Sequence, residues 1–156
     1  MRQIRVLCVG KKQEPYLKTG IDVYQKKLQR YCRFELIPLK EANYGKGSKL
    51  QWQRKEQKEI ESQYRPQTYI IACDEKGETL SSPQLADKLK SIANQGFSKI
   101  DFVVGGPFGL PQEIKAGSHL MLSLSSMTLT HQMIRLLLAE QIYRAFTIIK
   151  GEKYHH

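Results

Sequence analysis

Apolar residues in this chain alternate between short continuous runs and longer stretches with a helical repeat. The short runs, which are typical of buried strands, cover residues 4–9, 34–39, 68–73, 100–104 and 120–124. Pro38 places the second run at a strand end or a sheet edge, because proline cannot donate a hydrogen bond to a neighbouring strand. Repeated alternation of strand and helix predicts an α/β fold with a mainly parallel sheet and flanking helices.

Helical periodicity is clearest in two stretches. Apolar side chains recur every three or four residues from Leu17 to Tyr31, which predicts an amphipathic helix. Residues 132–149 are helix-like but carry apolar side chains on more than one face, so we expect this last helix to be covered on more than one side. Two shorter helices are predicted, one capped by Ser82 with Pro83 in its first turn and one over residues 111–116.

The remaining segments are polar. Residues 40–49 contain two glycines and three lysines and predict an exposed loop. Residues 50–64 are highly charged with few apolar anchors, so at most a solvated helix is expected there. Residues 74–77 predict the turn that ends the third strand.

Length and charge narrow the class of protein. The 156 residues fit one domain, residues 1–156, and the 40% of apolar residues support a packed core. No apolar run approaches the ~20 residues of a membrane span, and the N-terminus lacks a secretory signature, so no membrane partner is expected. The net charge of +10 and the pI near 9.6 attract polyanions such as RNA, although a basic enzyme without a nucleic-acid partner remains open.

Cysteine usage indicates a reducing compartment. Cys8, Cys32 and Cys73 form no CxxC pair, so neither a zinc site nor a disulfide framework is supported. Cys8 and Cys73 stand in apolar runs and are expected to be small buried hydrophobic side chains.

Segments that could bind a ligand follow three of the predicted strands. Ligands bind outside the carboxyl ends of strands in open α/β sheets. Those ends are Cys73-Asp74, Gly105-Gly106-Pro107 and residues 125–130. The Gly-Gly-Pro turn is neither a GxGxxG fingerprint nor a phosphate-binding P-loop, and it is either a close backbone approach to a ligand or a tight turn.

Hydroxyl side chains are concentrated just before the last helix. Thr128 or Thr130 either caps that helix, or the whole stretch offers hydroxyls and backbone amides to a polar small molecule. No serine stands in a G-x-S-x-G elbow and no histidine pair has H-E-x-x-H spacing. His119 is expected to be structural, and terminal residues such as 154–156 are by default frayed.

Several motifs occur together in one order and spacing. They are Phe102-Val103-Val104-Gly105-Gly106-Pro107-Phe108-Gly109-Leu110, Leu122-Ser123-Leu124-Ser125, Met127-Thr128-Leu129-Thr130-His131, Glu140-Gln141-Ile142-Tyr143-Arg144-Ala145 and Tyr154-His155. With Thr19-Gly20 and Asp74-Glu75-Lys76-Gly77, the whole chain resembles the ribosomal RNA large subunit methyltransferase H family of the SPOUT superfamily.

The resemblance implies an S-adenosylmethionine-dependent methyltransferase that acts on N3 of a pseudouridine in 23S rRNA, without a metal. It implies a donor site at Cys73 and Gly105, with acceptor-side catalytic roles for Tyr154 and His155. The rest of the donor site would be the loop Ser125, Ser126, Met127, Thr128, Leu129 and Thr130. Departures from the family pattern are Phe108 in place of a polar residue, Thr130 in place of proline, and the tail Gly-Glu-Lys-Tyr-His-His.

The same resemblance implies a SPOUT-type fold with a C-terminal trefoil knot, a cytoplasmic homodimer, and 23S rRNA within the assembled ribosome as the partner.

Two other function classes are alternatives to this methyltransferase. A non-catalytic basic RNA-binding module has no need of three polar or glycine-rich loops at strand ends. A nucleotide-dependent dehydrogenase would need the GxGxxG turn, which this chain lacks.

Overall fold

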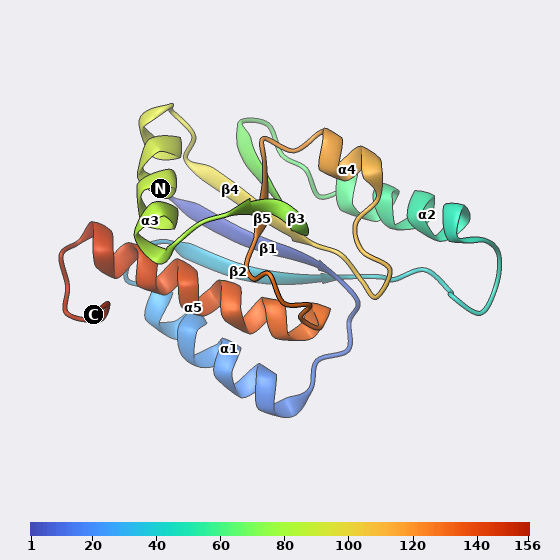
Figure 1. Cartoon of the computed structure of the whole chain (residues 1–156), viewed down its shortest axis with the longest axis horizontal. Coiled ribbons are helices and arrows are strands. Elements are labelled where there is room, and N and C mark those ends of the chain that lie inside the picture. The colour runs from blue at the N-terminus through green and yellow to red at the C-terminus, as the bar shows by residue number, and fades with distance from the viewer.

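Five parallel strands form the centre of the protein, in a computed structural model that describes residues 1–156 (Figure 1). The strands are β1 (Gln3–Val9), β2 (Arg33–Leu39), β3 (Thr68–Thr79), β4 (Lys99–Val104) and β5 (Leu120–Ser123). They lie in the order β2-β1-β4-β3-β5, and every neighbouring pair is parallel. The predicted α/β class is therefore confirmed, and β2, which contains Pro38, lies at an edge as expected.

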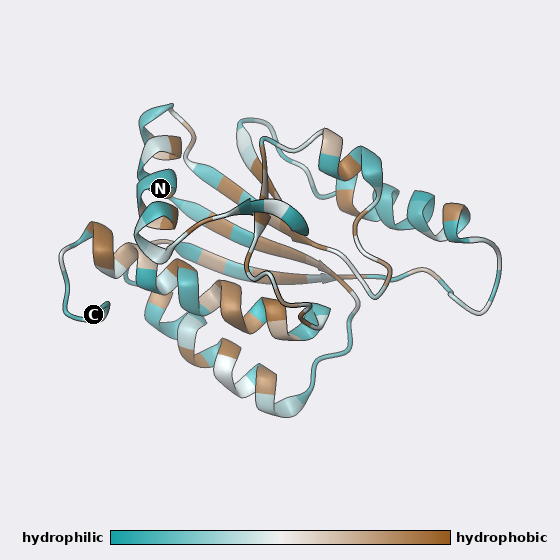
Figure 2. Ribbon diagram, viewed as in Figure 1, coloured by the Kyte–Doolittle hydropathy of each residue, from teal (hydrophilic) through white to brown (hydrophobic).

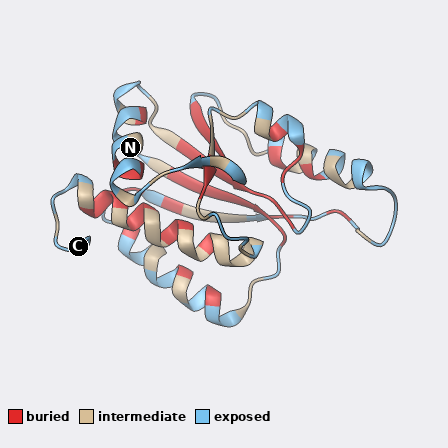
Figure 3. Cartoon of the chain, viewed as in Figure 1, coloured by how far each residue is buried: buried red, intermediate tan, exposed pale blue.

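Helices cover both faces of this sheet. One face carries α1 (Pro15–Leu28), α3 (Ser82–Asn94) and α5 (His131–Ile149), and the other carries α2 (Lys49–Glu61) and α4 (Gln112–Ala116) (Figure 1). Side chains alternate between the two cores along β1, as the pleat of a strand requires. Cys8 packs into the core under α1, α3 and α5, whereas Leu7 and Val9 pack under α2 and α4. The inner strands β1 and β4 and the first half of β3 are accordingly mostly apolar and buried, whereas the edge strand β2 is only partly buried (Figures 2 and 3).

The last helix, α5, packs between α1 and α3 and lies across the sheet. Leu138, Ala139 and Ile142 on it are fully buried, while Met133 and Leu136 remain half-buried. The expectation that this helix is covered on more than one side is confirmed. No helix of the chain is both long enough and apolar enough to span a lipid bilayer.

The predicted turn at residues 74–77 is wrong, because β3 continues through it to Thr79. Beyond an irregularity after Cys73, the strand pairs again with β5 through Glu78 and Thr79. Gly77 permits this close approach, since a Cβ there would lie 2.7 Å from the backbone nitrogen of Leu122. Residues 74–77 pair with no residue of β5 themselves, and the pairs that Cys73 and Glu78 form on either side of them keep the strand continuous.

The start of α3 also differs by one residue from the prediction. Ser81, not Ser82, is the cap, and its hydroxyl accepts a hydrogen bond from the backbone N–H of Gln84 at 3.3 Å. The Gln84 side chain in turn accepts from the Ser81 N–H at 2.8 Å, which completes a capping box. Pro83 lies in the first turn, as predicted.

The charged stretch that follows the loop at residues 40–48 forms helix α2. A second capping box, between Ser48 and Gln51, starts the helix. Its buried side chains are Ile60 and Glu56, and the Glu56 carboxylate accepts hydrogen bonds from the Ala42 N–H at 3.0 Å and the Tyr44 hydroxyl at 2.6 Å. Glu56 therefore anchors the preceding loop to α2.

Candidate active site

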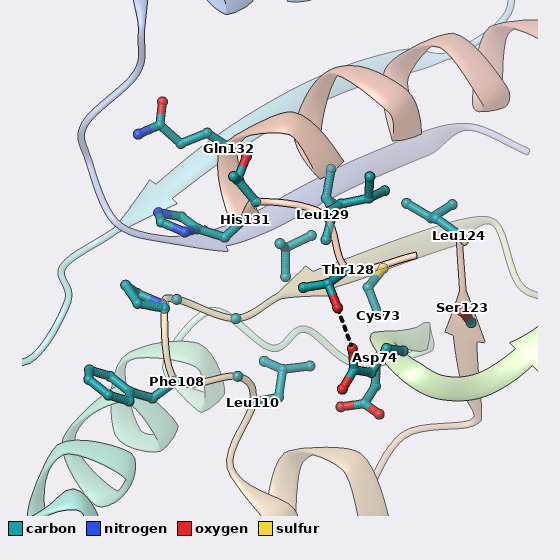
Figure 4. A pocket seen from close by; sticks show the side chains of 18 of the residues that line it. Cys73, Asp74, Phe108, Leu110, Ser123, Leu124, Thr128, Leu129, His131 and Gln132 are labelled. Carbon is teal, nitrogen blue, oxygen red and sulfur yellow. Dashed lines mark hydrogen bonds between the residues drawn. The ribbon is translucent and has the colours of Figure 1, made fainter. Parts of the chain in front are cut away.

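A cavity of about 850 Å³ opens at the carboxyl ends of three neighbouring strands, β4, β3 and β5 (Figure 4). Cys73 stands at its floor, opposite Val104 on one side and Leu122 on the other. The cavity is lined further by residues 104–110, by most of the segment 122–132, by two residues each of α1 and α2, and by one residue of α4. Its volume is typical of small-molecule sites, and its place in the sheet is where α/β folds bind ligands.

Gly105 and the turn after it form one wall of the cavity. The Gly109 N–H donates to the Gly106 carbonyl at 3.0 Å, and Gly109 has a φ of +78°. A Cβ on Gly105 would lie 2.6 Å from the Gly109 carbonyl carbon, so no side chain fits there. The segment is therefore a tight turn, and its backbone lines the cavity, so a close approach to a ligand stays a prediction.

The loop at residues 125–130 forms the facing wall. Ser125 Oγ accepts from the Met127 N–H at 2.9 Å, and the Thr128 hydroxyl reaches Glu75 at 3.5 Å across the cavity (Figure 4). Thr130 Oγ1 accepts from the Met133 N–H at 3.2 Å, so Thr130 is the cap of α5. Five of the six predicted loop residues line the cavity, whereas Ser126 does not.

Charged groups stand at the cavity floor beside Cys73. Burial raises the pKa of the Cys73 thiol to about 12, with a smaller contribution from the Asp74 carboxylate. The thiol is therefore protonated at neutral pH and cannot act as a thiolate nucleophile. Lys115 lies 3.5 Å from the Asp74 carboxylate, so this end of the cavity holds both signs of charge.

His131, the first residue of α5, also lines the cavity. Burial lowers its pKa, the Arg135 guanidinium lowers it further, and Glu41 acts in the opposite direction. The ring is therefore neutral at physiological pH and presents one nitrogen as a hydrogen-bond acceptor.

Arg135 fixes this helix end to the sheet. Its guanidinium is fully buried and donates to the backbone carbonyls of Val9 at 3.1 Å and Gly10 at 2.9 Å. A second nitrogen of the same group donates to the Lys12 carbonyl at 3.2 Å. The sequence analysis did not single out Arg135, although an arginine within an apolar helix was the signal that could have found it.

Tyr154 and His155 do not reach the cavity of their own chain. The cavity lies at the start of α5, and these residues follow its opposite end (Figure 1). The 19 residues of this helix span about 28 Å. Within one chain, the two groups of predicted site residues are therefore far apart.

The tail is nevertheless held in a defined position. The Tyr154 ring packs edge-on against Tyr143 at 4.8 Å, and its hydroxyl lies 3.4 Å from Tyr24 and 3.3 Å from Glu140. The hydrogen bond with Tyr24, together with desolvation, raises the pKa of the Tyr154 phenol, which stays protonated at neutral pH. His155 lies beside Arg144, with 3.4 Å between the two nitrogens. The default expectation of a frayed terminus is not met by Tyr154.

His119 does not line the cavity. His119 is structural as predicted, because its Nδ1 accepts from the Ile70 N–H at 2.9 Å and its ring stacks on Tyr69. The sequence analysis missed several polar residues that line the cavity from the flanking helices. These are Glu14, Tyr16, Lys49, Gln53, Lys115 and Gln132.

Comparisons with known proteins agree with this geometry. Residues 2–155 match the family model described as "Predicted SPOUT methyltransferase". The chain is 40% identical to the ribosomal RNA large subunit methyltransferase H of Streptococcus uberis, over 98% of this chain and 99% of the relative. It is also 40% identical to the protein of that name from Thermotoga neapolitana, over 99% of each chain.

A solved structure shows a similar fold at low sequence identity. It is described as the structure of a probable methylase family protein from Haemophilus influenzae Rd KW20 and is 14% identical to this chain. The TM-score is 0.51, and the match covers 98% of this chain and 70% of the other. At this identity the likeness supports the fold alone.

Proposed function

The chain belongs to the SPOUT methyltransferase family, and we propose that it transfers a methyl group from S-adenosylmethionine to N3 of a pseudouridine in 23S rRNA. The observation that carries the proposal is the cavity at the ends of β3, β4 and β5, whose walls are the two loops that match the family motifs. Those walls offer backbone groups and hydroxyls rather than a metal-binding or nucleophilic cluster.

The residues of the cavity fit a donor such as S-adenosylmethionine. A Cβ on Gly105 would meet the backbone of Gly109 and Leu110, so glycine keeps the turn closed, and a flat group would lie against the part of this turn that lines the cavity. On the facing wall, Ser125, Met127, Thr128, Leu129 and Thr130 would hold the adenosine and methionine portions. Asp74 and Lys115 supply opposite charges for the ammonium and carboxylate of the methionine end.

The chemistry needs positioning more than acid–base power. S-adenosylmethionine supplies a methyl group made electrophilic by its sulfonium. The N3–H of pseudouridine lies between two carbonyls and is comparatively acidic, so a weak base suffices and alignment contributes most of the rate. His155 would accept this proton or orient the base, and Tyr154, which stays protonated, would stack on the base or donate a hydrogen bond to it.

A homodimer would bring the tail to the cavity. A two-fold axis across α5 would place the C-terminal end of one helix beside the N-terminal end of its partner. Exposed apolar side chains on the neighbouring helix α1 support an interface on this face, since Tyr16 and Val23 lie on one stripe of α1 and are 68% and 47% exposed. Each active site would then combine the donor cavity of one chain with Tyr154 and His155 of the other.

Sedimentation velocity tests the dimer. At micromolar concentration we expect a species of twice the chain mass of 18.0 kDa. Val23→Glu should shift it toward monomer, because it introduces a charge into the apolar stripe. Leu50→Glu is the matched control, since Leu50 is 56% exposed on α2, on the other face of the sheet. A wild-type monomer, or equal behaviour of the two variants, would contradict this interface.

Family membership motivates the remaining parts of the proposal. Residues 1–156 would act as one methyltransferase domain with a C-terminal trefoil knot, in the cytoplasm, on 23S rRNA within the assembled ribosome. The net charge of +10 suits an RNA substrate, because basic side chains bind phosphates and position the RNA.

Methyl transfer to ribosomes tests the function. Purified protein, labelled S-adenosylmethionine and ribosomes from cells lacking the gene should yield a labelled 23S rRNA. Mass spectrometry of the digested RNA should then show one pseudouridine that is heavier by a methyl group. Donor binding without transfer to either ribosomes or free 23S rRNA would contradict the proposal. RNA binding without donor binding would favour the non-catalytic RNA-binding module.

A further inference from the structure

Beside the cavity, three aromatic rings from separate segments form a cluster, which we call the aromatic cluster: Tyr44, Trp52 and Phe108. The ring centroid of Phe108 lies 5.0 Å from that of Tyr44 and 5.2 Å from that of Trp52. The centroids of Tyr44 and Trp52 are 5.3 Å apart. Phe108 is 47% exposed and belongs to the turn that forms the Gly105 wall. In Figure 4 it lies next to α2, on the side of the cavity away from Ser123.

The two supporting rings are held by buried or backbone groups. The Tyr44 hydroxyl donates to the Glu56 carboxylate, which is only 3% exposed. The Trp52 indole N–H donates to the Lys46 carbonyl at 2.6 Å. The polar atoms of both rings are therefore satisfied within the chain, and the rings hold Phe108 from two sides. A ligand that stacks on Phe108 would meet a ring that is already positioned, so binding orders little more of the chain.

Two lysines lie close to this cluster in the chain. Lys49 lines the cavity one helical turn before Trp52, and Lys46, whose carbonyl accepts from the Trp52 indole, precedes it in the loop. Both lysines are exposed, and neither forms an ion pair within the chain. An exposed aromatic face beside unpaired basic side chains is the arrangement that binds single-stranded nucleic acid, with the bases stacked and the phosphates neutralised.

We propose that the aromatic cluster is a base-stacking subsite, in which Phe108 takes an unpaired base next to the modified nucleotide and Lys49 contacts its phosphate. The inference rests on the proposed function, since it places a second nucleotide of the same RNA on the rim of the methyl-transfer cavity. Unpaired nucleotides are the part of RNA whose bases are free to stack, so the subsite selects a single-stranded segment over a duplex.

The fluorescence of Trp52, the one tryptophan of the chain, reports RNA binding at the aromatic cluster. A mixed-sequence single-stranded RNA oligonucleotide, added without donor, should quench Trp52 emission. The same strand annealed to its complement should quench it much less. Phe108→Leu keeps an apolar side chain but removes the π face, and it should raise the Kd for the single strand at least ~5-fold, the low end of the stacking contribution per base. Phe108→Tyr should bind as the wild type does.

The salt dependence of RNA binding distinguishes stacking on Phe108 from contact with a phosphate. The ratio of the Kd of Phe108→Leu to that of the wild type should stay constant as salt rises, because no counterion is released by a neutral ring. Lys49→Gln should lower the slope of log K against log salt by roughly 0.7, the value for one phosphate contact on a single strand. Leu50→Ala is the matched control on α2, since Leu50 is exposed but does not line the cavity.

Three outcomes would overturn the inference. One is a Phe108→Leu variant that binds the single strand as the wild type does. Another is equal binding and equal quenching by single strand and duplex. The third is a loss of S-adenosylmethionine affinity in Phe108→Leu with unchanged RNA affinity, which would assign the ring to the donor. These titrations involve no methyl transfer, so a protein that binds RNA in this way and fails to methylate ribosomes contradicts the proposed function alone.

Discussion

Gly105→Ala is expected to reduce the affinity for S-adenosylmethionine on the order of 100-fold, the upper end of what a single overpacked methyl group of ~1–3 kcal/mol produces. The new Cβ would lie 2.6 Å from the Gly109 carbonyl carbon and 2.8 Å from the Leu110 nitrogen. Both are backbone atoms, which cannot rotate away as a flexible side chain does. The turn at residues 105–110 must therefore shift, and it forms one wall of the cavity in which we propose that the donor binds.

Calorimetry with S-adenosylmethionine measures this effect, and thermal unfolding shows whether the variant stays folded. Gly45→Ala is the matched control, because Gly45 lies in an exposed loop and has the flexible Asn43 side chain at 3.3 Å as its neighbour. The control should bind the donor as the wild type does. A folded Gly105→Ala protein with unchanged affinity would show that the donor does not lie against this turn.

Local sequence patterns were sufficient for the strands and for the strand-end half of the site. Each apolar run forms a strand, and parallel strands end at one edge of a sheet. This arrangement explains why Cys73, Gly105 and the loop at residues 125–130 could be expected together. A helix cap was likewise predicted at Thr128 or Thr130, and the structure shows that it is Thr130.

Long-range contacts decide the features that local patterns did not reveal. Residues 74–77 have the composition of a turn, yet the pairing of the flanking Cys73 and Glu78 with β5, more than forty residues later, keeps the segment within β3. From the sequence alone, Arg135 would be expected at the surface. It is buried because the fold places the backbone carbonyls of Val9 and Gly10 where they accept hydrogen bonds from its guanidinium. The aromatic cluster likewise joins three segments whose contact depends on how α2 packs on the sheet.

Removing Tyr154 to His156 is expected to lower turnover at least ~100-fold, the low end of what a positioned acid–base or orienting group contributes. Donor affinity should change little, because none of these residues lines the cavity of its own chain. Dimerisation should persist, since the tail lies beyond the end of α5, although loss of the Tyr154 packing on Tyr143 will weaken that end locally. Removal of His156 alone is the matched control and should leave turnover close to that of the intact protein.

Mixing two impaired variants, at a donor concentration too low for Gly105→Ala to bind it, tests whether the tail acts across a dimer. The truncated chain keeps an intact donor cavity, and the Gly105→Ala chain keeps an intact tail. If each active site takes its cavity from one chain and its tail from the other, a mixed dimer contains one complete site, and activity should return when subunits exchange. A mixture that forms mixed dimers but stays inactive would contradict sharing between chains. A group that aligns or deprotonates the acceptor must act in the methyl-transfer step, which single-turnover methylation measures. If the truncated protein methylates at the rate of the intact protein in that experiment, neither Tyr154 nor His155 takes part in the mechanism.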